Sequence, residues 1–507
     1  MASKTQSLKS TRKWYQWYSP EDTPEERRFL LKLDLIILPV ALLSFWIKNM
    51  DYSNINRRTD NAYVSGMKEE LGFYGNQLVQ LQTLFTVATV VCQLPFAYLF
   101  TRVPLHILLP SMELSWGVFN LLQYRANSFG ELVAYRFMVG VFESAFFPAV
   151  QFVLGSWYRG DEIARRGAFF YVGQTVGAMS TGLLTGSIAT TFGGRHGLSG
   201  WRWMFIFTSV ITFPIALLGY VLWPGTPLKP NKLFLSDADV ALARNRLERH
   251  GHFDKNGSQE EPSLNLAIIK KTLSSWKIYL LTLWDVIFWA TGLHVSGGTY
   301  LLWIKSLGRY KVAEVNNLGS TAPAIGIFYL FLFCFASDLF LGRAWAISLS
   351  YGWNMIGLII LVVWNVPESA KWFAYNTIYG ATIISPVFHG WANDILKHNT
   401  AERAFVLVIM NCVAQGMTAW IALLVFPTVE APRYTKGFSF TLALSFIFLG
   451  MVQVIRHLHS RDEEQQEAAS SGRAETPRDE VVVQVGKVDV TSTSVSTATP
   501  GIFAKLE

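Results

Sequence analysis

The sequence predicts an all-α, polytopic membrane protein with twelve transmembrane helices arranged in two six-helix halves. Of its 507 residues, 51% are hydrophobic and only 16% are charged, whereas soluble globular proteins carry about 25% charged residues. The shortfall comes from segments of about 20 residues that are almost free of charge, the length that crosses a hydrocarbon core of roughly 30 Å. Six such segments precede a polar stretch and six follow it, which indicates two related halves.

The first half follows a polar N-terminal segment, residues 1–32, which lacks the apolar region of a cleaved signal peptide. Here Thr23, Pro24 and Glu26 form a helix-start signature, because threonine caps a helix, proline suits its first position and glutamate closes a capping box. We therefore expect a short amphipathic helix at the membrane surface. The N-terminal six-helix domain, residues 33–223, has spans predicted at 33–53, 77–99, 104–123, 131–154, 167–190 and 202–223.

A central loop, residues 224–276, contains PGTPLKPNK and HGHFDKNGSQEEPS, which are rich in turn-forming and charged residues and cannot span a bilayer. Residues 458–507 form a tail whose composition cannot bury a core, so we expect disorder there. Between the loop and the tail lies the C-terminal six-helix domain, residues 277–457, with spans predicted at 277–303, 317–337, 344–364, 370–391, 403–426 and 435–457.

Lys and Arg residues decide the orientation, because cytosolic connections carry an excess of them. With an even number of spans, both termini and the central loop share one side. That side holds 29 of the 43 Lys and Arg residues, against 12 on the other. The short connections alone would favour the opposite orientation, but the charges nearest the first and seventh spans lie in the N-terminal segment and central loop. We therefore predict that both termini are cytosolic.

The sequence carries no sign of enzyme chemistry. It has no glycine-rich phosphate loop, no HExxH and no paired CxxC, so ATP-driven pumping is not expected. Cys92, Cys334 and Cys412 all fall in apolar segments, where cysteine acts as a small apolar packing residue. We predict no cofactor, no metal and no nucleic-acid partner, because the net charge of +7 reflects basic flanks of the spans.

Ionisable residues inside the spans are the strongest functional signal. A charge at the bilayer centre costs at least about 2.5–3.5 kcal/mol, so it usually faces the protein interior or a water-filled cavity. The residues concerned are Lys48 and Asp51 in the first span, Glu113 in the third, Arg136 and Glu143 in the fourth, and Asp285 and His294 in the seventh.

The first and fourth spans each offer a basic and an acidic group on one helix face. Lys48 and Asp51 are three residues apart, and Arg136 and Glu143 are seven apart. One interpretation is two neutralised pairs that hold helices together. The other is a site in which Asp51 and Glu143 exchange protons while Lys48 and Arg136 attract an anion, and we predict the second.

The remaining polar residues are less specific. Asp285, His294 and Asn376 are predicted to bind substrate, although each also fits an internal packing contact. Glu113 fits a structural role better than a functional one. Other amides inside spans can bind substrate or tie helices together; they are Gln174, Asn354, Asn411 and Gln415.

Several stretches resemble the major facilitator superfamily. RFMVGVFESAFFPAVQFVLGSWYRGDEIARRGAFFYVG (136–173) is similar to the fourth and fifth spans of its anion:cation symporter branch. GWRWMFIFTSVITFPIALLGYVLWPGTP (200–227) resembles the sixth span of the fungal allantoate permease family. NAYVSGMKEELGFYGNQLVQLQTLFTVATVVCQLP (61–95) and VFPTVEAPRYTKGFSFTL (426–442) look closest to pantothenate transporters. The resemblance covers about residues 25–460 and implies two six-helix domains that alternate access to a central cavity.

The resemblance also implies roles for individual residues. Asp51, Arg136 and Glu143 match positions that handle coupling in this branch. Many relatives outside fungi have an arginine directly after the first-span aspartate, but Tyr52 stands there in this chain, and Lys48 is placed to supply the missing charge.

Two features concern the connections between spans. The superfamily's basic loop between spans 2 and 3 is reduced to FTRVPLHILLP, which keeps Arg102, and the loop SDLFLGRAW between spans 8 and 9 keeps Asp338 and Arg343. These three residues are expected to act in gating. Arg57–Asp60 (RRTD) looks like an insertion relative to fungal members, and a natural insertion and a gene-model artefact both remain open.

The combined prediction is a monomeric, proton-coupled importer of a small organic anion, such as pantothenate or another vitamin-type carboxylate, in the lipid bilayer of a fungal plasma membrane. A monovalent anion that enters a negative cell works against roughly 2.3 kcal/mol per 100 mV, so import requires coupling. An exporter of a secondary metabolite and a nutrient receptor that binds without transport are the alternatives. The short, featureless tail argues against the receptor.

Overall fold

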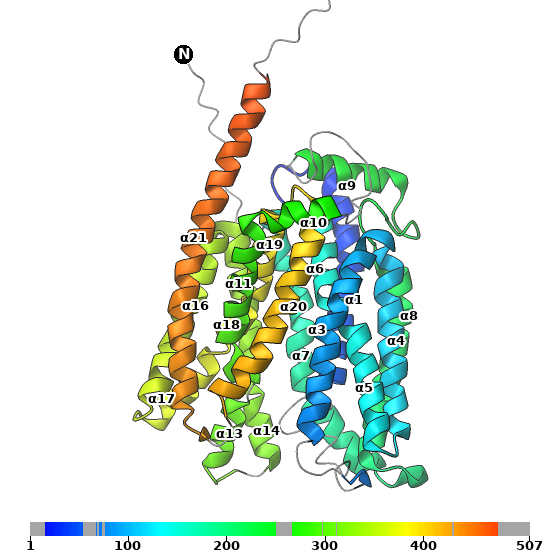
Figure 1. Ribbon diagram of the computed structural model, residues 1–507, viewed down its shortest axis with the longest axis vertical. Coiled ribbons are helices and arrows are strands. Elements are labelled where there is room, and N and C mark those ends of the chain that lie inside the picture. Colours follow the sequence, from blue (N-terminus) through cyan, green and yellow to red (C-terminus); the bar gives the residue numbers. More distant parts are fainter. Residues whose placement is uncertain are drawn as a thin grey trace, which may run out of the picture. The chain divides into compact units, whose positions relative to one another are not determined.

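The structure, a computed structural model, is almost entirely helical (Figure 1). It describes residues 16–53, 67, 70–72, 77–249, 266–296, 298–310, 312–427 and 430–474, and no β-strand occurs within these ranges. The chain divides into a main unit, Met1–His457, and a second unit, Leu458–Glu507. The insertion predicted at Arg57–Asp60 lies outside the described residues.

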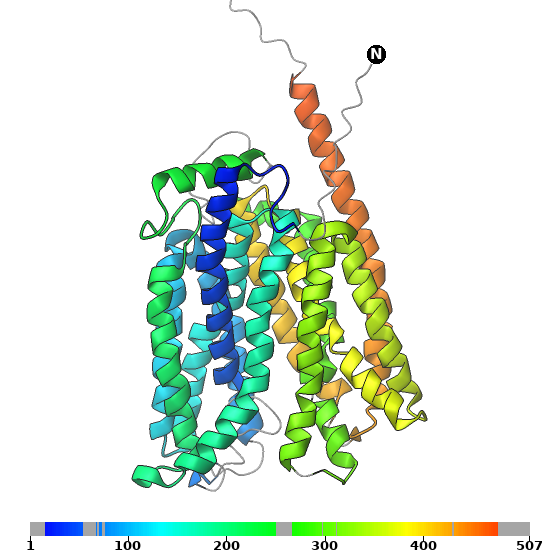
Figure 2. The same cartoon turned by 180° about the vertical axis from the view of Figure 1, so that it is seen from behind.

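The N-terminal half pairs its helices closely. Helix α1 packs along α7, α4 packs against α8, and α3 packs against α5; Figure 2 shows α1 beside α7 from behind. The helices are α1 (Pro24–Ser53), α3 (Gln77–Arg102), α4 (Leu105–Leu122), α5 (Phe129–Glu143), α6 (Phe146–Trp157), α7 (Gly160–Phe192) and α8 (Gly200–Leu222), followed by α9 (Asp237–Arg249) and α10 (Leu266–Leu273) in the connection to the second half.

The C-terminal half is built around the packing of α11 against α20. Helices α7 and α3 of the first half reach it, because α7 contacts α15 and α19 while α3 contacts α20. Its helices are α11 (Trp276–Thr291), α12 (Leu293–Ser296), α13 (Thr299–Ser306), α14 (Val312–Gly319), α15 (Thr321–Ala336), a π turn (Ser337–Leu341), α16 (Arg343–Val363), α17 (Glu368–Thr377), α18 (Gly380–Ile383), α19 (Ser385–Ile395), α20 (Thr400–Val425) and α21 (Thr435–Ala474).

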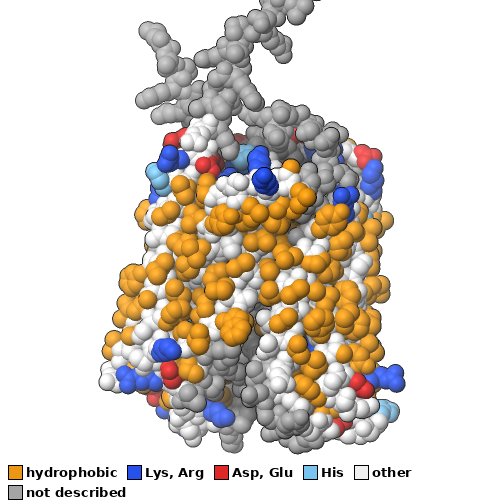
Figure 3. Space-filling model, viewed as in Figure 1, with side chains coloured by type: hydrophobic (Ala, Val, Ile, Leu, Met, Phe, Trp, Pro, Cys, Tyr) orange, Lys and Arg blue, Asp and Glu red, His pale blue; other side chains and the backbone are white. Residues whose placement is uncertain are grey.

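The surface fits a bilayer. On the face drawn in Figure 3, hydrophobic side chains cover the middle, and Lys, Arg, Asp and Glu gather towards the two ends. Within the described residues, nine helices are long and apolar enough to cross a membrane. The other three predicted spans are helical as well: α4 and α7 cover two of them, and α17 to α19 together cover the third.

The start of α1 confirms the predicted capping box but not a separate surface helix. The Thr23 amide donates to Glu26 Oε2 over 2.8 Å, and the Glu26 amide donates to Thr23 Oγ1 over 3.2 Å. From Pro24 the helix continues unbroken to Ser53, so the expected short helix is the first part of the first span. The cause is local: Phe29, Leu30 and Leu33 are buried, and no helix-breaking residue separates them from the membrane segment.

Three predicted spans are interrupted. The fourth breaks between α5 and α6, immediately after Glu143, and the seventh and tenth each divide into three short helices. Discontinuous helices in transporters occur where a binding site interrupts the membrane span. The last helix departs from prediction in the other direction, since α21 continues to Ala474 although disorder was expected from residue 458. The sequence DEEQQEAA in this extension is rich in good helix formers.

The contact between α1 and α7 depends on Gly173. A Cβ atom added at Gly173 would lie 2.3 Å from the carbonyl oxygen of Leu42, and neighbouring backbones cannot shift cheaply in a packed interior. We expect Gly173→Ala to lower the melting temperature of the purified protein by several degrees, corresponding to about 1–3 kcal/mol. Gly352→Ala is the matched control, because an added Cβ there meets nothing within 4 Å. Equal melting temperatures for the two variants would contradict the prediction.

Candidate functional site

The structure brings together the four charged residues predicted in the first and fourth spans. Lys48 Nζ of α1 lies 3.6 Å from Glu143 Oε2 of α5. The Glu143 side chain is fully buried, whereas that of Lys48 is 19% exposed. The ion pair therefore joins α1 to α5, and the Lys48 side chain remains partly exposed.

Asp51 points in a different direction from Lys48. It is fully buried and accepts hydrogen bonds from Asn120 Nδ2 of α4 (2.8 Å) and Thr212 Oγ1 of α8 (3.3 Å). Asn120 also donates to Thr208 Oγ1 over 3.0 Å. Lys48 and Asp51 are three residues apart on α1, yet they engage different partners.

Arg136 lies near the end of α1. Its Nη2 donates to the carbonyl oxygen of Tyr52 over 3.4 Å, and its guanidinium lies 4.3 Å from the centre of the Phe85 ring of α3. The side chain is 1% exposed, and a guanidinium over an aromatic face is a favourable cation–π contact. Arg136 and Glu143 also have different partners, and among the described residues no ion pair joins the two charged groups of either span.

This arrangement gives the N-terminal half two cations and two carboxylates in one buried region. Removing one partner of a buried ion pair leaves an uncompensated charge that costs about 3–5 kcal/mol. Protonation of Glu143 removes the counter-charge of Lys48, whose partly exposed ammonium can then pair with another anion. The site thus contains the two groups, a buried carboxylate and a partly exposed ammonium, that exchange of a proton for an anionic ligand would require.

The three predicted residues of the C-terminal half have partners within that half. Asp285 of α11 is buried with His389 of α19, whose Nε2 lies 3.7 Å from Asp285 Oδ1. His294 Nε2 lies 3.1 Å from the carbonyl oxygen of Ile378. Asn376 Nδ2 donates to the carbonyl oxygen of its own helix at Trp372 over 2.8 Å. Their substrate contacts stay predictions.

The predicted gating residue Asp338 connects the two halves. One carboxylate oxygen lies 2.9 Å from Arg343 Nη1 of α16, and the other lies 3.1 Å from Arg165 Nε of α7 and also accepts from the Arg165 amide over 2.9 Å. Arg102 lies 5.2 Å from the ring centre of Tyr98, and its carbonyl oxygen accepts from Lys229 over 2.9 Å. Asp338 is therefore held by Arg165 of the first half and by Arg343 of the second half.

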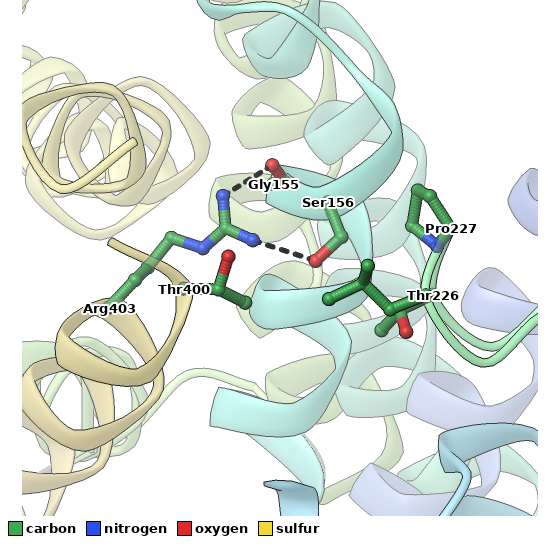
Figure 4. Close-up of a pocket in the computed structure, with 7 residues that line it drawn as sticks. Gly155, Ser156, Thr226, Pro227, Thr400 and Arg403 are labelled. Atoms are coloured by element: carbon green, nitrogen blue, oxygen red, sulfur yellow. Dashed lines mark hydrogen bonds between the residues drawn. The ribbon is translucent and has the colours of Figure 1, made fainter. Parts of the chain in front are cut away.

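A second contact between the halves surrounds a small pocket (Figure 4). Arg403 reaches from α20 to α6, where Nη1 donates to the carbonyl oxygen of Gly155 over 2.7 Å and Nη2 donates to Ser156 Oγ over 2.8 Å. A cation at the end of a helix interacts favourably with its last carbonyl groups. Thr226, Pro227 and Thr400 also line the pocket, whose volume of about 10 Å³ is too small for a vitamin-sized molecule.

Charged groups from three segments meet at the same end of the main unit. Arg246 of α9 lies 2.6 Å from Glu162 at the start of α7 and 3.3 Å from Asp22 of the N-terminal segment. Burial raises the pKa of Glu162, but Arg166, Arg246 and Arg159 outweigh it and hold the pKa well below its usual value. These contacts agree with the prediction that the N-terminal segment and the central loop share one side of the membrane.

Several residues of these contacts were not singled out from the sequence. Arg165 lies in a short connection between predicted spans and Arg403 at the start of a span, positions where a basic residue is ordinary. His389 lies inside the span predicted at 370–391, so the signal that identified His294 was sufficient to find it. Tyr171, which contacts Ser385 across the two halves, had no signal in the sequence, because a tyrosine in an apolar span is ordinary.

The predicted family is tested by comparison with known proteins. The model of the Major Facilitator Superfamily matches residues 53–453. The chain is 36% identical over 460 residues to the Vitamin H transporter of Saccharomyces cerevisiae, which covers 90% of this chain and 77% of the relative. It is 31% identical over 444 residues to the pantothenate transporter liz1 of Schizosaccharomyces pombe, which covers 86% of this chain and 83% of the relative.

A solved structure supports the same assignment at the level of the fold. The proton:xylose symporter XylE, bound to 6-bromo-6-deoxy-D-glucose, matches with a TM-score of 0.65 at 14% identity, over 83% of this chain and 96% of that chain. The predicted fold, with twelve spans in two six-helix halves, is confirmed, whereas the narrower allantoate permease family stays a prediction. Because the family model matches well over half of the sequence, the chain is a multi-pass membrane protein that belongs to the Major Facilitator Superfamily.

Proposed function

We propose that the protein is a proton-coupled symporter that imports a small organic anion across the plasma membrane, with both termini in the cytosol. The family and the relatives support a transporter of small organic substrates rather than an enzyme. The observation that carries the finer proposal is the Lys48–Glu143 pair, a buried carboxylate 3.6 Å from a partly exposed ammonium. Such a pair can exchange its internal carboxylate for that of a substrate.

The cycle follows from the charges of this site. A proton from the acidic outer side neutralises Glu143, and Lys48 then pairs with the substrate anion. Arg136 supplies a second cation next to Asp51. Hydrogen bonds from Asn120 and Thr212 hold the Asp51 carboxylate in place. On the cytosolic side Glu143 loses its proton, recovers Lys48 as its partner and displaces the substrate. One proton makes import of a monovalent anion electroneutral, and a second makes it voltage-driven.

The contacts between the halves support a closed cytosolic gate in this conformation. Asp338 with Arg165, and Arg403 with Gly155, join the halves at the end that carries α9. Opening requires both contacts to break, which exposes buried charges to water. We propose that the Asp338 and Arg403 contacts hold the carrier closed to the cytosol until substrate and proton are loaded.

The substrate proposal is a vitamin-type carboxylate. Two of the relatives are named for transport of vitamin H, which is biotin, and of pantothenate. Each of these vitamins carries a single carboxylate and an uncharged polar body. The test is uptake of labelled biotin and labelled pantothenate by cells that express this chain and lack their own carriers. Accumulation of neither vitamin above control cells would contradict the substrate proposal.

Proton coupling gives a separate prediction. Uptake of the transported vitamin should rise several-fold as the outer pH falls from 7 to 5, and it should collapse with a protonophore, because the proton gradient then no longer drives loading of Glu143. Initial rates measured at equal concentrations of the substrate anion check this expectation. Uptake that responds to neither treatment would reject symport.

A further inference from the structure

Asp285 and His389 form an isolated acid–base pair inside the C-terminal half. The side chain of Asp285 is fully buried, and that of His389 is 3% exposed. Aromatic rings surround them. The ring centre of Phe388 lies 4.1 Å from that of Trp284 and 4.6 Å from that of Phe288. The ring centre of Phe147 of α6 lies 5.0 Å from that of His389. The pair is therefore held in an apolar surrounding contributed by both halves.

The contacts of His389 with Ser385 bear on its tautomer. Nδ1 lies 3.0 Å from the carbonyl oxygen of Ser385 and 2.9 Å from its Oγ. A carbonyl oxygen can only accept, so this contact favours the tautomer with the hydrogen on Nδ1, in which the Nε2 lone pair faces Asp285. Within the described residues, neither carboxylate oxygen of Asp285 receives a hydrogen bond of normal geometry, although the Trp289 indole lies close by.

These facts set the number of protons that the pair can hold. An ionised carboxylate in an apolar interior is very costly unless it is paired and hydrogen-bonded. Two arrangements avoid this cost: a neutral carboxyl beside a neutral imidazole, or a carboxylate beside an imidazolium. Both arrangements contain one more proton than the deprotonated pair, so the closed site retains one proton.

The groups brought by neighbouring helices do not change this count. The charged or titratable side chains that neighbouring helices bring near the pair include Tyr171 of α7, which interacts with Asp285, and Arg343 of α16, which approaches Gly390 and is paired with Asp338. Arg403 is held by α6, and His294 is bonded to the carbonyl oxygen of Ile378. Among the described residues, His389 is therefore the basic residue that lies within ion-pair distance of Asp285.

A contact between the two halves closes the site. The hydroxyl of Tyr171, on α7 of the first half, hydrogen-bonds Ser385 Oγ, which in turn contacts His389. The residues are well packed there, because a Cβ added at Gly167 would lie 3.1 Å from Pro386. When α6 and α7 of the first half separate from α19, Tyr171 leaves Ser385 and Phe147 leaves the His389 ring.

We propose that Asp285 and His389 are a second proton-binding site, closed by the Tyr171–Ser385 contact and opened to water when the two halves separate. On opening, the carboxyl of Asp285 gives its proton to water, and the carboxylate that remains is hydrated and faces His389. This inference rests on the proposed proton coupling and adds a residue pair in the second half to it. The enclosure of Asp285 favours proton binding over the predicted substrate contact.

The first test requires no substrate. Infrared spectra of the purified protein at pH 7 should show a protonated carboxyl band that is missing from Asp285→Asn and shifts in His389→Gln. Glu113→Gln is the matched comparison, because Glu113 is equally buried but lies in α4; it can remove a carboxyl band of its own, and it should leave the band assigned to Asp285 in place. If Asp285→Asn removes only ionised carboxylate bands and His389→Gln removes no imidazolium band, the closed pair holds no proton and the proposal is overturned.

The second test measures protons moved per substrate in vesicles, with labelled biotin or pantothenate. Wild type and Glu113→Gln should share one ratio, and Asp285→Asn should lose about one proton per substrate molecule while exchange of labelled for unlabelled substrate continues. An unchanged ratio in Asp285→Asn overturns the second site and leaves symport intact. Uncoupled uptake in wild type instead rejects the proposed function.

A third measurement tests the proposal even if Asp285→Asn and His389→Gln do not fold. Tyr171→Phe removes one hydroxyl and no charge, so it should fold, and vesicles containing it should admit protons several-fold faster than wild type without substrate. An internal pH-sensitive dye reports the leak. A leak equal to that of wild type argues that the Tyr171–Ser385 contact does not close the site and overturns that part of the proposal.

Discussion

Replacing Arg136 with leucine is expected to abolish transport while the protein still reaches the membrane. Arg136 is 1% exposed, and its charge is held by the Tyr52 carbonyl and the Phe85 ring. Leucine keeps the apolar contact with Phe85 but removes the cation offered to the substrate anion. Loss of a charge-assisted contact of about 3 kcal/mol lowers the uptake rate by about 100-fold or more. Initial uptake rates, normalised to the surface amount of protein, measure this effect.

Arg136→Lys is the matched control. Lysine keeps the positive charge but has no planar guanidinium to lie on the Phe85 ring, so it should retain part of the activity. Full activity in Arg136→Leu would remove Arg136 from the site. Loss of the protein from the membrane in both variants would show that the guanidinium itself is needed for folding, through its contacts with the Tyr52 carbonyl and the Phe85 ring.

The fold was predictable because the bilayer imposes it on the sequence. A span must be about 20 residues long and nearly free of charge, and the predicted ranges coincide with helices throughout the described residues. The capping box at Thr23 was predictable for a local reason, since both of its hydrogen bonds are made within four residues. The breaks after Glu143 and at Gly292 were not predicted, because hydrophobic runs do not reveal where a helix is interrupted.

The membership of the site was predictable, but its pairing was not. An ionisable residue in an apolar span is rare, and this rarity identified Lys48, Asp51, Arg136 and Glu143. Spacing along one helix suggested partners on the same face, whereas the structure pairs Lys48 with Glu143 of another helix and Asp51 with Asn120. Contacts between helices depend on the packing of α1 against its neighbours, which spacing along a single helix cannot express.

The pairing of Lys48 with Glu143 sharpens the second large prediction, that Glu143→Gln separates substrate exchange from uphill transport. Glutamine has the shape of protonated glutamate but cannot ionise, so Lys48 permanently lacks its internal counter-charge. The variant should still bind the substrate anion and exchange labelled for unlabelled substrate, because exchange needs no net proton movement. It should fail to accumulate substrate above the outer concentration, and its affinity should lose most of its pH dependence. Counterflow and proton-driven uptake in the same vesicles test both halves of this prediction.

Two further variants decide how a different result would be interpreted. Lys48→Met removes the cation and should lose counterflow as well as uptake, in contrast to Glu143→Gln. Asp51→Asn should share the Glu143→Gln phenotype if both carboxylates titrate, with some loss of stability, because one amide oxygen must replace two oxygens that accept from Asn120 and Thr212. Accumulation like that of wild type in Glu143→Gln would leave Asp51 and Asp285 to carry the coupling. Loss of counterflow in Glu143→Gln would instead mean that its charge orients Lys48 for binding, because the carboxylate, and not only its proton, would then be required.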